Sequence, residues 1–138
     1  MAGAPNELIA QIPLFAGLDK KELKAVGGAL KDRSFKSGSA VVEAGATGVG
    51  FFVIESGTAT VSVGDREVRT LGPGDHFGEI ALIADTPRTA TITASSDLAC
   101  YGMTPWDFKG LVEKNGKIAW KLMHTLAKRL IEAEQHDS

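Results

Sequence analysis

The feature that most constrains this chain is a series of short β-type runs punctuated by glycine, from Ser34 to about Thr104. Glycine clusters of this kind mark tight turns between strands. Because no helical crossovers interrupt the runs, they predict a small closed barrel or jelly roll rather than a parallel sheet. The glycines are Gly38, Gly45, Gly48, Gly57, Gly64, Gly72 and Gly74.

Individual runs can be placed from their residue types. Phe51–Ile54 and Ala59–Val63 flank Glu55–Gly57, which predicts a hairpin. The second run alternates apolar and polar residues, so one of its faces is expected to be buried. With Thr89–Ala94 and Leu98–Met103, the runs make up about eight antiparallel strands.

Helical patterns flank the β-rich region. Asp19 and Glu22 form a capping box before residues that recur at helical spacing, and the preceding segment Leu8–Phe15 is expected to pack against that helix. Thr104 followed by Pro105 is a typical helix start.

A last helix is expected after Gly116, as a packed amphipathic helix of about four turns. Its apolar residues lie on two ridges, Ile118, Leu122, Leu126, Leu130 and Ala119, Met123, Ala127, Ile131. The fold class is therefore α+β: a helical segment over 1–33, an antiparallel β-roll over 34–104, and two C-terminal helices over 105–138.

Composition limits the function classes. A chain of 138 residues is expected to form one domain. Its net charge of −2 provides no global positive field, so neither nucleic acid nor a membrane is an expected partner. The single Cys100 excludes an internal disulfide, and the first residues lack the pattern of a secretion signal, so we expect a cytoplasmic protein.

The segment most informative about chemistry follows the turn Gly72–Asp75. Gly78 would let backbone approach a ligand, and a short helix over Glu79–Ile83 would direct free N–H groups at an anion. Arg88, held behind a proline, adds a permanent charge whose planar fork matches phosphate oxygens. The segment thus predicts a local anion site.

Glu79 is unexpected beside a bound phosphate, because two negative charges repel. A ligand that also carries a hydroxyl donor would satisfy the carboxylate, while Arg88 balances the phosphate. Together the two residues favour a sugar phosphate over other anions.

The blocks Phe77–Leu82 and Pro87–Thr91 resemble the phosphate-binding cassette of the cyclic nucleotide-binding domain family, which includes catabolite activator protein, protein kinase A regulatory subunits and cyclic nucleotide-gated channels. We therefore assign a cassette over 77–91. The resemblance implies that Glu79 accepts the ribose 2′-OH and that Arg88 pairs with the cyclic phosphate.

The same resemblance implies further contacts with the nucleotide. Backbone groups would come from Gly78, Ile80 and Ala81, a hydroxyl from Thr89, and walls of the base pocket from Val61 and Leu71. Arg129 and Ala133 would approach the base from the last helix, which would act as a lid. The helical wheel agrees, since both residues fall on the arc of Ile118 and Leu122.

The resemblance thus implies a sensor that binds cAMP reversibly, with cGMP as the alternative ligand, and that regulates an effector protein or a fused effector domain. No catalytic residue, cofactor or metal is expected, and the oligomeric state is left open. Two other readings remain. His76 and Glu79 could be metal ligands of a cupin-like enzyme, or the chain could be an interaction domain that binds no nucleotide.

Overall fold

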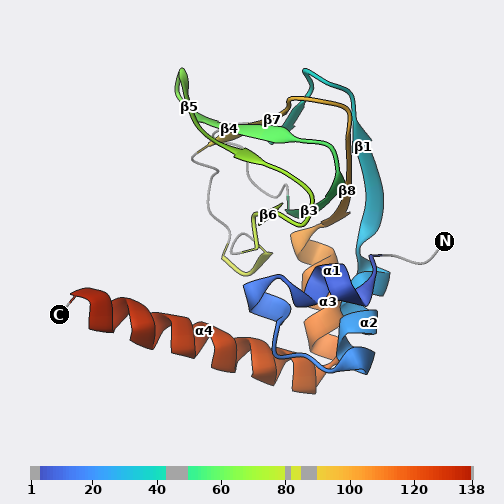
Figure 1. The fold of residues 1–138 in the computed structure, drawn as a ribbon. Helices are drawn as coiled ribbons and strands as arrows, with labels where there is room; N and C mark the ends of the chain where they lie inside the picture. The colour runs from blue at the N-terminus through green and yellow to red at the C-terminus, as the bar shows by residue number, and fades with distance from the viewer. Residues whose placement is uncertain (1–3, 43–49, 80–81, 85–89, 138) are drawn as a thin grey trace.

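The computed structural model describes residues 4–42, 50–79, 82–84 and 90–137. A β-roll lies above a layer of helices, and the C-terminal helix extends to one side (Figure 1). In chain order the elements are α1 (Asn6–Ala10), the 3-10 turn η1 (Pro13–Phe15), α2 (Lys20–Ala29), β1 (Lys31–Phe35), β2 (Ala40–Val42), β3 (Phe51–Ser56), β4 (Ala59–Val63), β5 (Arg66–Leu71), β6 (His76–Phe77), β7 (Thr91–Ala94), β8 (Leu98–Met103), α3 (Pro105–Lys114) and α4 (Gly116–Asp137).

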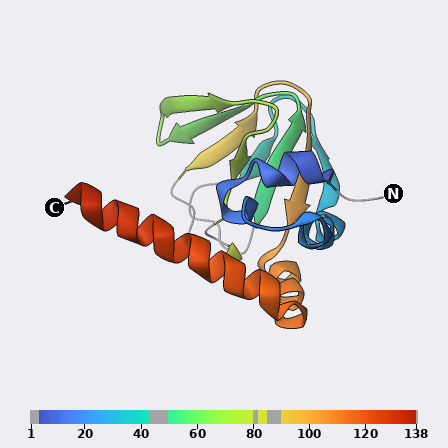
Figure 2. The ribbon, with the colours of Figure 1, turned by 60° about the horizontal axis from the view of Figure 1, so that its bottom comes forward.

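The strands of the described ranges form two four-stranded sheets, with orders β1-β8-β3-β6 and β2-β7-β4-β5. Neighbouring strands pair antiparallel throughout. The turned view shows the two sheets facing each other above the helices (Figure 2). The predicted antiparallel roll of about eight strands with helices at both ends is confirmed. Its first strand begins at Lys31 rather than at the predicted Ser34.

The predicted hairpin between Phe51–Ile54 and Ala59–Val63 is wrong. β3 pairs with β8 and β6, whereas β4 pairs with β5 and β7 in the other sheet. Gly57, with φ of +90°, carries the chain from one sheet to the other, and a Cβ there would overlap the carbonyl oxygen of Asp97. The glycine therefore marks a change of sheet, and the hairpin of this region joins β4 to β5.

Local capping signals proved reliable. Asp19 accepts from the Glu22 N–H at 2.8 Å, and the Glu22 carboxylate accepts from the Asp19 N–H at 2.9 Å, so the predicted capping box starts α2. Thr104 caps α3 by accepting from the Asp107 N–H at 3.1 Å, with Pro105 at the first helical position.

Two apolar clusters hold the fold together. One lies between the helices and the lower part of the roll, where Phe15 and Phe51 make an edge-to-face contact at 6.0 Å. It includes Leu14 from the segment that was expected to pack on α2. The second fills the roll, where Phe52 and Phe77 stack at 5.3 Å. β3 serves both clusters, since its successive side chains point to opposite faces.

Helix α4 differs from its prediction in length and packing. It has 22 residues, or about six turns. Ile118 and Leu122, near its start, are buried, but Leu130 and Ile131 are 61% and 54% exposed. The second half of α4 projects beyond the roll in both views (Figures 1 and 2). The expectation of a helix packed along both ridges is therefore wrong for the second half, where the side chains of both ridges are exposed.

Across the parts of the chain that the structure describes, no helix combines the length and apolar character needed to cross a bilayer.

Candidate functional site

The turn Gly72–Asp75 fixes where the candidate site begins. The Asp75 carboxylate accepts from the Gly72 N–H at 2.8 Å, and the Asp75 N–H donates to the Gly72 carbonyl at 3.0 Å. The turn is tied to β3, because Gly74 donates to the Ile54 carbonyl and Ile54 donates to the Asp75 carbonyl, both at 2.8 Å. These bonds direct the chain into β6, as expected for turn chemistry.

The backbone changes direction directly after β6. Gly78 has φ of +89°, a conformation that side chains with a Cβ rarely adopt. Glu79 follows, and its carbonyl accepts from the Leu82 N–H at 3.2 Å. Leu82 is 5% exposed within the helix-side cluster, so it anchors the far end of this turn.

The Glu79 carboxylate is largely withdrawn from solvent, with its side chain 15% exposed. Its Oε2 lies 2.7 Å from Nδ1 of His76, whose side chain is 23% exposed. The distance is that of an ion pair, but the N–H direction lacks hydrogen-bond alignment, and Nδ1 finds no other partner among the described residues.

Three neighbouring side chains hold Glu79 in its ionised form. The His76 imidazole is the main cause of a lowered pKa of the Glu79 carboxyl, opposed by burial and supported by the charges of Arg129 and Arg69. These groups come from three elements, β6, α4 and β5. Glu79 is thus an ionised hydrogen-bond acceptor at the place where the roll approaches α4.

Four of the predicted contact residues, Ile80, Ala81, Arg88 and Thr89, lie outside the described residues. Their expected contacts with a nucleotide stay predictions. The described flanks of this segment are the Gly78–Glu79 turn on one side and β7, starting at Thr91, on the other.

The two predicted wall residues lie close together inside the roll. Val61 on β4 and Leu71 on β5 are 8% and 3% exposed and belong to one cluster with Phe77 and Ile92. The register places Ala59 opposite Leu71 and Val61 opposite Arg69, which makes Val61 and Leu71 diagonal neighbours. Both residues belong to the apolar interior of the roll, in the same cluster as Phe77, which directly precedes the Gly78–Glu79 turn.

The two predicted residues of α4 lie on its solvent-exposed second half. Arg129 and Ala133 are both exposed. Arg129 is nevertheless close enough to Glu79 to lower its pKa. The structure therefore associates Arg129 with Glu79, while the predicted contact with a base stays a prediction for both residues.

A hollow of about 590 Å³ lies elsewhere, between α2 and the start of α4. Its lining includes Asp19, Glu22 and four lysines, and none of the predicted contact residues. Size alone would favour this hollow. The withdrawn, charge-balanced carboxylate of Glu79 gives stronger chemical grounds for a site at the end of β6.

The alternative reading, a metal site at His76 and Glu79, lacks a third ligand among the described residues. Within the described ranges, no three His, Cys, Asp or Glu side chains gather where they could hold a metal ion. His76 and Glu79 form a pair, and catalytic metal sites use three protein ligands as a rule.

Sequence reasoning missed two residues near Glu79. His76 was considered only as a metal ligand, although its i, i+3 spacing to Glu79 could have indicated a contact within one tight turn. Arg69 gave no local signal, because only the β4–β5 register brings it opposite Val61.

Comparison with known proteins identifies the family of this chain. Residues 32–115 match the family model described as cyclic nucleotide-binding domain. Among curated relatives, the cGMP-dependent protein kinase of Eimeria tenella is 38% identical over 95 residues, which is 69% of this chain and 10% of that protein. A cyclic nucleotide-gated potassium channel of Rhizobium etli is 33% identical over 123 residues, 89% of this chain and 34% of the channel. The chain thus spans a minor part of these relatives.

Solved structures show the same architecture. The N-terminal domain of a Streptomyces coelicolor transcriptional regulator superposes with a TM-score of 0.87 at 22% identity, over 95% of both chains, and shows the shared fold. The regulatory domain of Toxoplasma gondii PKA with cAMP has a TM-score of 0.70 at 29% identity, over 77% of this chain and 42% of that chain. The catabolite activator protein of Thermus thermophilus has a TM-score of 0.70 at 28% identity, over 90% and 61%. The chain belongs to the cyclic nucleotide-binding domain family.

Proposed function

We propose that this chain is a regulatory module that binds cAMP reversibly and does not turn it over. The observation that carries the proposal is the Glu79 carboxylate, which is 15% exposed, has a pKa lowered first by His76 and then by Arg129 and Arg69, and directly follows the Gly78 turn. A buried carboxylate without a direct lysine or arginine ion pair among the described residues suits a neutral hydroxyl donor.

In this proposal the ligand is recognised at three places. The ribose 2′-OH donates to Glu79, and the cyclic phosphate is held by Arg88, Thr89 and backbone N–H groups of Gly78, Ile80 and Ala81. Val61 and Leu71 face the base from the roll. We favour cAMP over cGMP because two structural relatives above 25% identity are described with cAMP, although a cGMP-dependent kinase is among the sequence relatives.

Titration calorimetry with cAMP and with cGMP tests the proposal and ranks the two ligands. Arg88→Ala should weaken binding by about 2–5 kcal/mol, the range for removing one partner of a buried charge pair. The matched control is Arg66→Ala on the exposed part of β5, which should bind like the wild type. Equal affinity of both variants would contradict the role of Arg88.

We further propose that α4 closes over the bound base as a lid and passes the signal to an effector in the cytoplasm. Support comes from the second half of α4, where Leu130 and Ile131 are exposed, and from Arg129, whose charge already acts on Glu79. A ligand drives such a closure only if it binds the closed state more tightly.

Spin labels on Glu67→Cys in β5 and Glu132→Cys in α4 would report this movement. Both positions are exposed, whereas the native Cys100 is 3% exposed. Saturating cAMP should shift the distances between the labels to shorter values. An unchanged distance distribution would exclude the lid movement but leave cAMP binding untouched.

A further inference from the structure

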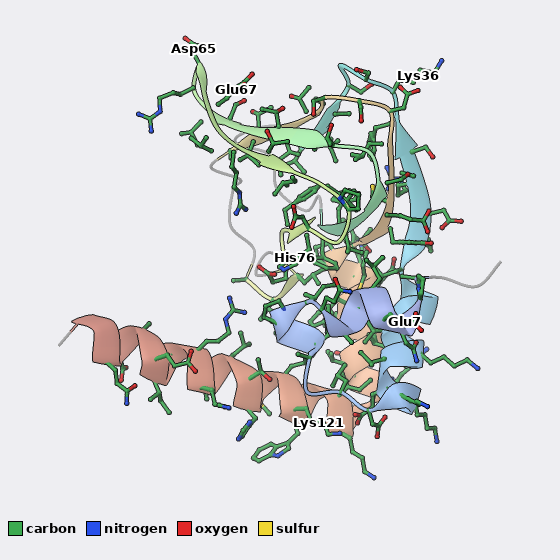
Figure 3. All side chains as sticks on the ribbon, in the orientation of Figure 1. Glu7, Lys36, Asp65, Glu67, His76 and Lys121 are labelled. Carbon is green, nitrogen blue, oxygen red and sulfur yellow. The ribbon has the colours of Figure 1, made fainter. Side chains whose placement is uncertain are left out.

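His76 is anchored in the sheet through both its backbone and its ring. It lies on β6, where it pairs with Val53 of β3. Its ring is tilted against Phe51, with centroids 6.1 Å apart, and Phe51 is fully buried. Figure 3 shows His76 at the end of the roll that faces the helices. The imidazole therefore extends from a strand of the sheet, whereas Glu79 lies in the turn that follows this strand.

The imidazole of His76 approaches one of the two carboxylate oxygens of Glu79. Nδ1 of His76 approaches Oε2 of Glu79 at 2.7 Å. Nδ1 itself is buried and lacks an aligned partner in the described structure. A buried ring nitrogen without a hydrogen bond is costly, and Oε2 of Glu79 is an acceptor within hydrogen-bond distance of it.

The two arginines near Glu79 act on its carboxylate without contacting it in the described structure. Arg129 and Arg69 lower its pKa through their charge alone, with smaller effects than His76. A charge at a distance keeps the carboxylate ionised but does not choose its orientation. Only a group in contact can do so, and among the described neighbours that group is His76.

We propose that His76 is a positioning residue for ribose recognition: it holds Oε2 of Glu79 and leaves Oε1 to accept the 2′-OH of the nucleotide. This inference rests on the proposed function of Glu79. A carboxylate that is already oriented loses less side-chain freedom when the hydroxyl binds, so His76 increases the affinity that the hydroxyl contributes. His76 should therefore matter for ribonucleotides and not for their 2′-deoxy analogues.

The test compares cAMP with 2′-deoxy-cAMP on the wild type and three variants by titration calorimetry. The variant His76→Phe keeps a ring against Phe51 but removes the nitrogen. His76→Asn places an amide N–H near the position of Nδ1 and should restore most of the effect. His124→Asn, on the exposed face of α4, is the control for loss of a histidine.

The wild type should prefer cAMP over the 2′-deoxy analogue by about tenfold or more, as for a hydrogen bond to a charged group. His76→Phe should reduce that preference several-fold, with the affinity for 2′-deoxy-cAMP nearly unchanged. His76→Asn should recover the preference, and His124→Asn should leave it intact. A merely structural histidine would not produce this pattern, because misfolding weakens both ligands.

Three results would overturn the proposal, and they are distinguishable. If the wild type binds neither ligand, the proposed function fails and this inference fails with it. If the wild type prefers cAMP and His76→Phe keeps that preference, His76 alone is excluded as a positioning residue. If His76→Phe and His76→Asn weaken both ligands equally while melting as the wild type does, His76 supports the pocket without orienting Glu79.

Discussion

Lys121 on α4 places its Nζ 2.6 Å from Oε1 of Glu22 on α2, and so joins the last helix to the N-terminal helical layer. Glu22 is also the residue that completes the α2 capping box. One carboxylate therefore supports both the start of α2 and the attachment of α4. Figure 3 shows Lys121 on the half of α4 that lies under the helices.

Replacing Lys121 with Met should destabilise the fold over a defined pH window. The pair lowers the pKa of Glu22 from its ordinary 4.5, so this contribution is lost as pH falls through the folded-state pKa below 4.5. It raises the pKa of Lys121 above 10.5, so that part is lost as pH rises past the folded-state value. Urea unfolding should show a deficit at pH 7 that shrinks as the pH is lowered below 4.5.

The control for this prediction is Lys117→Met, an exposed lysine one turn earlier on the same helix. It should leave the unfolding midpoint close to that of the wild type at neutral and at acidic pH. A Lys121→Met deficit that does not shrink as the pH falls below 4.5 would show that the aliphatic part of the side chain, and not the ion pair, is responsible.

Gly57→Ala should be among the more damaging single-methyl changes in the roll. It introduces strain at φ of +90° and overlap with the Asp97 carbonyl. Gly64→Ala is the matched control, since Gly64 also has positive φ but its Cβ would meet no atom within 4 Å. We expect Gly57→Ala to cost about 1–3 kcal/mol more than Gly64→Ala, the usual range for overpacking. Equal unfolding free energies would refute this account of the crossing between sheets.

Cys100 should be inert in the folded protein. Burial raises the pKa of its thiol to about 11, and the residue is 3% exposed. The thiolate is the reactive form, so an alkylating reagent at pH 8 should modify it only after unfolding in urea. A Glu67→Cys variant, with its second thiol on exposed β5, gives the positive control. Rapid modification of native Cys100 would mean that the roll opens readily.

Structural features that depend only on contacts between near neighbours in the chain could be predicted from the sequence. The Asp19 capping box and the Thr104 cap depend on contacts between residues three apart, and both form as predicted. The wrong hairpin at Gly57 shows the opposite case. A turn signal indicates that the chain reverses, but the partner of each strand depends on the whole roll.

The same limit applies to the candidate site. The apolar ridges of α4 predicted which residues share a face, but not that Leu130 would be 61% exposed. Glu79 could be singled out because its motif is local. The charges of Arg69 and Arg129 act on it only because the fold brings both arginines within electrostatic reach of Glu79.

The central claim is that Glu79 recognises a cyclic nucleotide, and calorimetric titration with cAMP of the wild type, Glu79→Ala and Glu67→Ala tests it most directly. Glu67 provides a matched carboxylate on exposed β5, near the β4–β5 tip (Figure 3). We predict saturable binding to the wild type, a loss of about 1.5–3 kcal/mol in Glu79→Ala, as for a hydrogen bond to a charged group, and no loss in Glu67→Ala. Absence of heat and of thermal stabilisation at millimolar cAMP, or undiminished binding by Glu79→Ala, would contradict the claim.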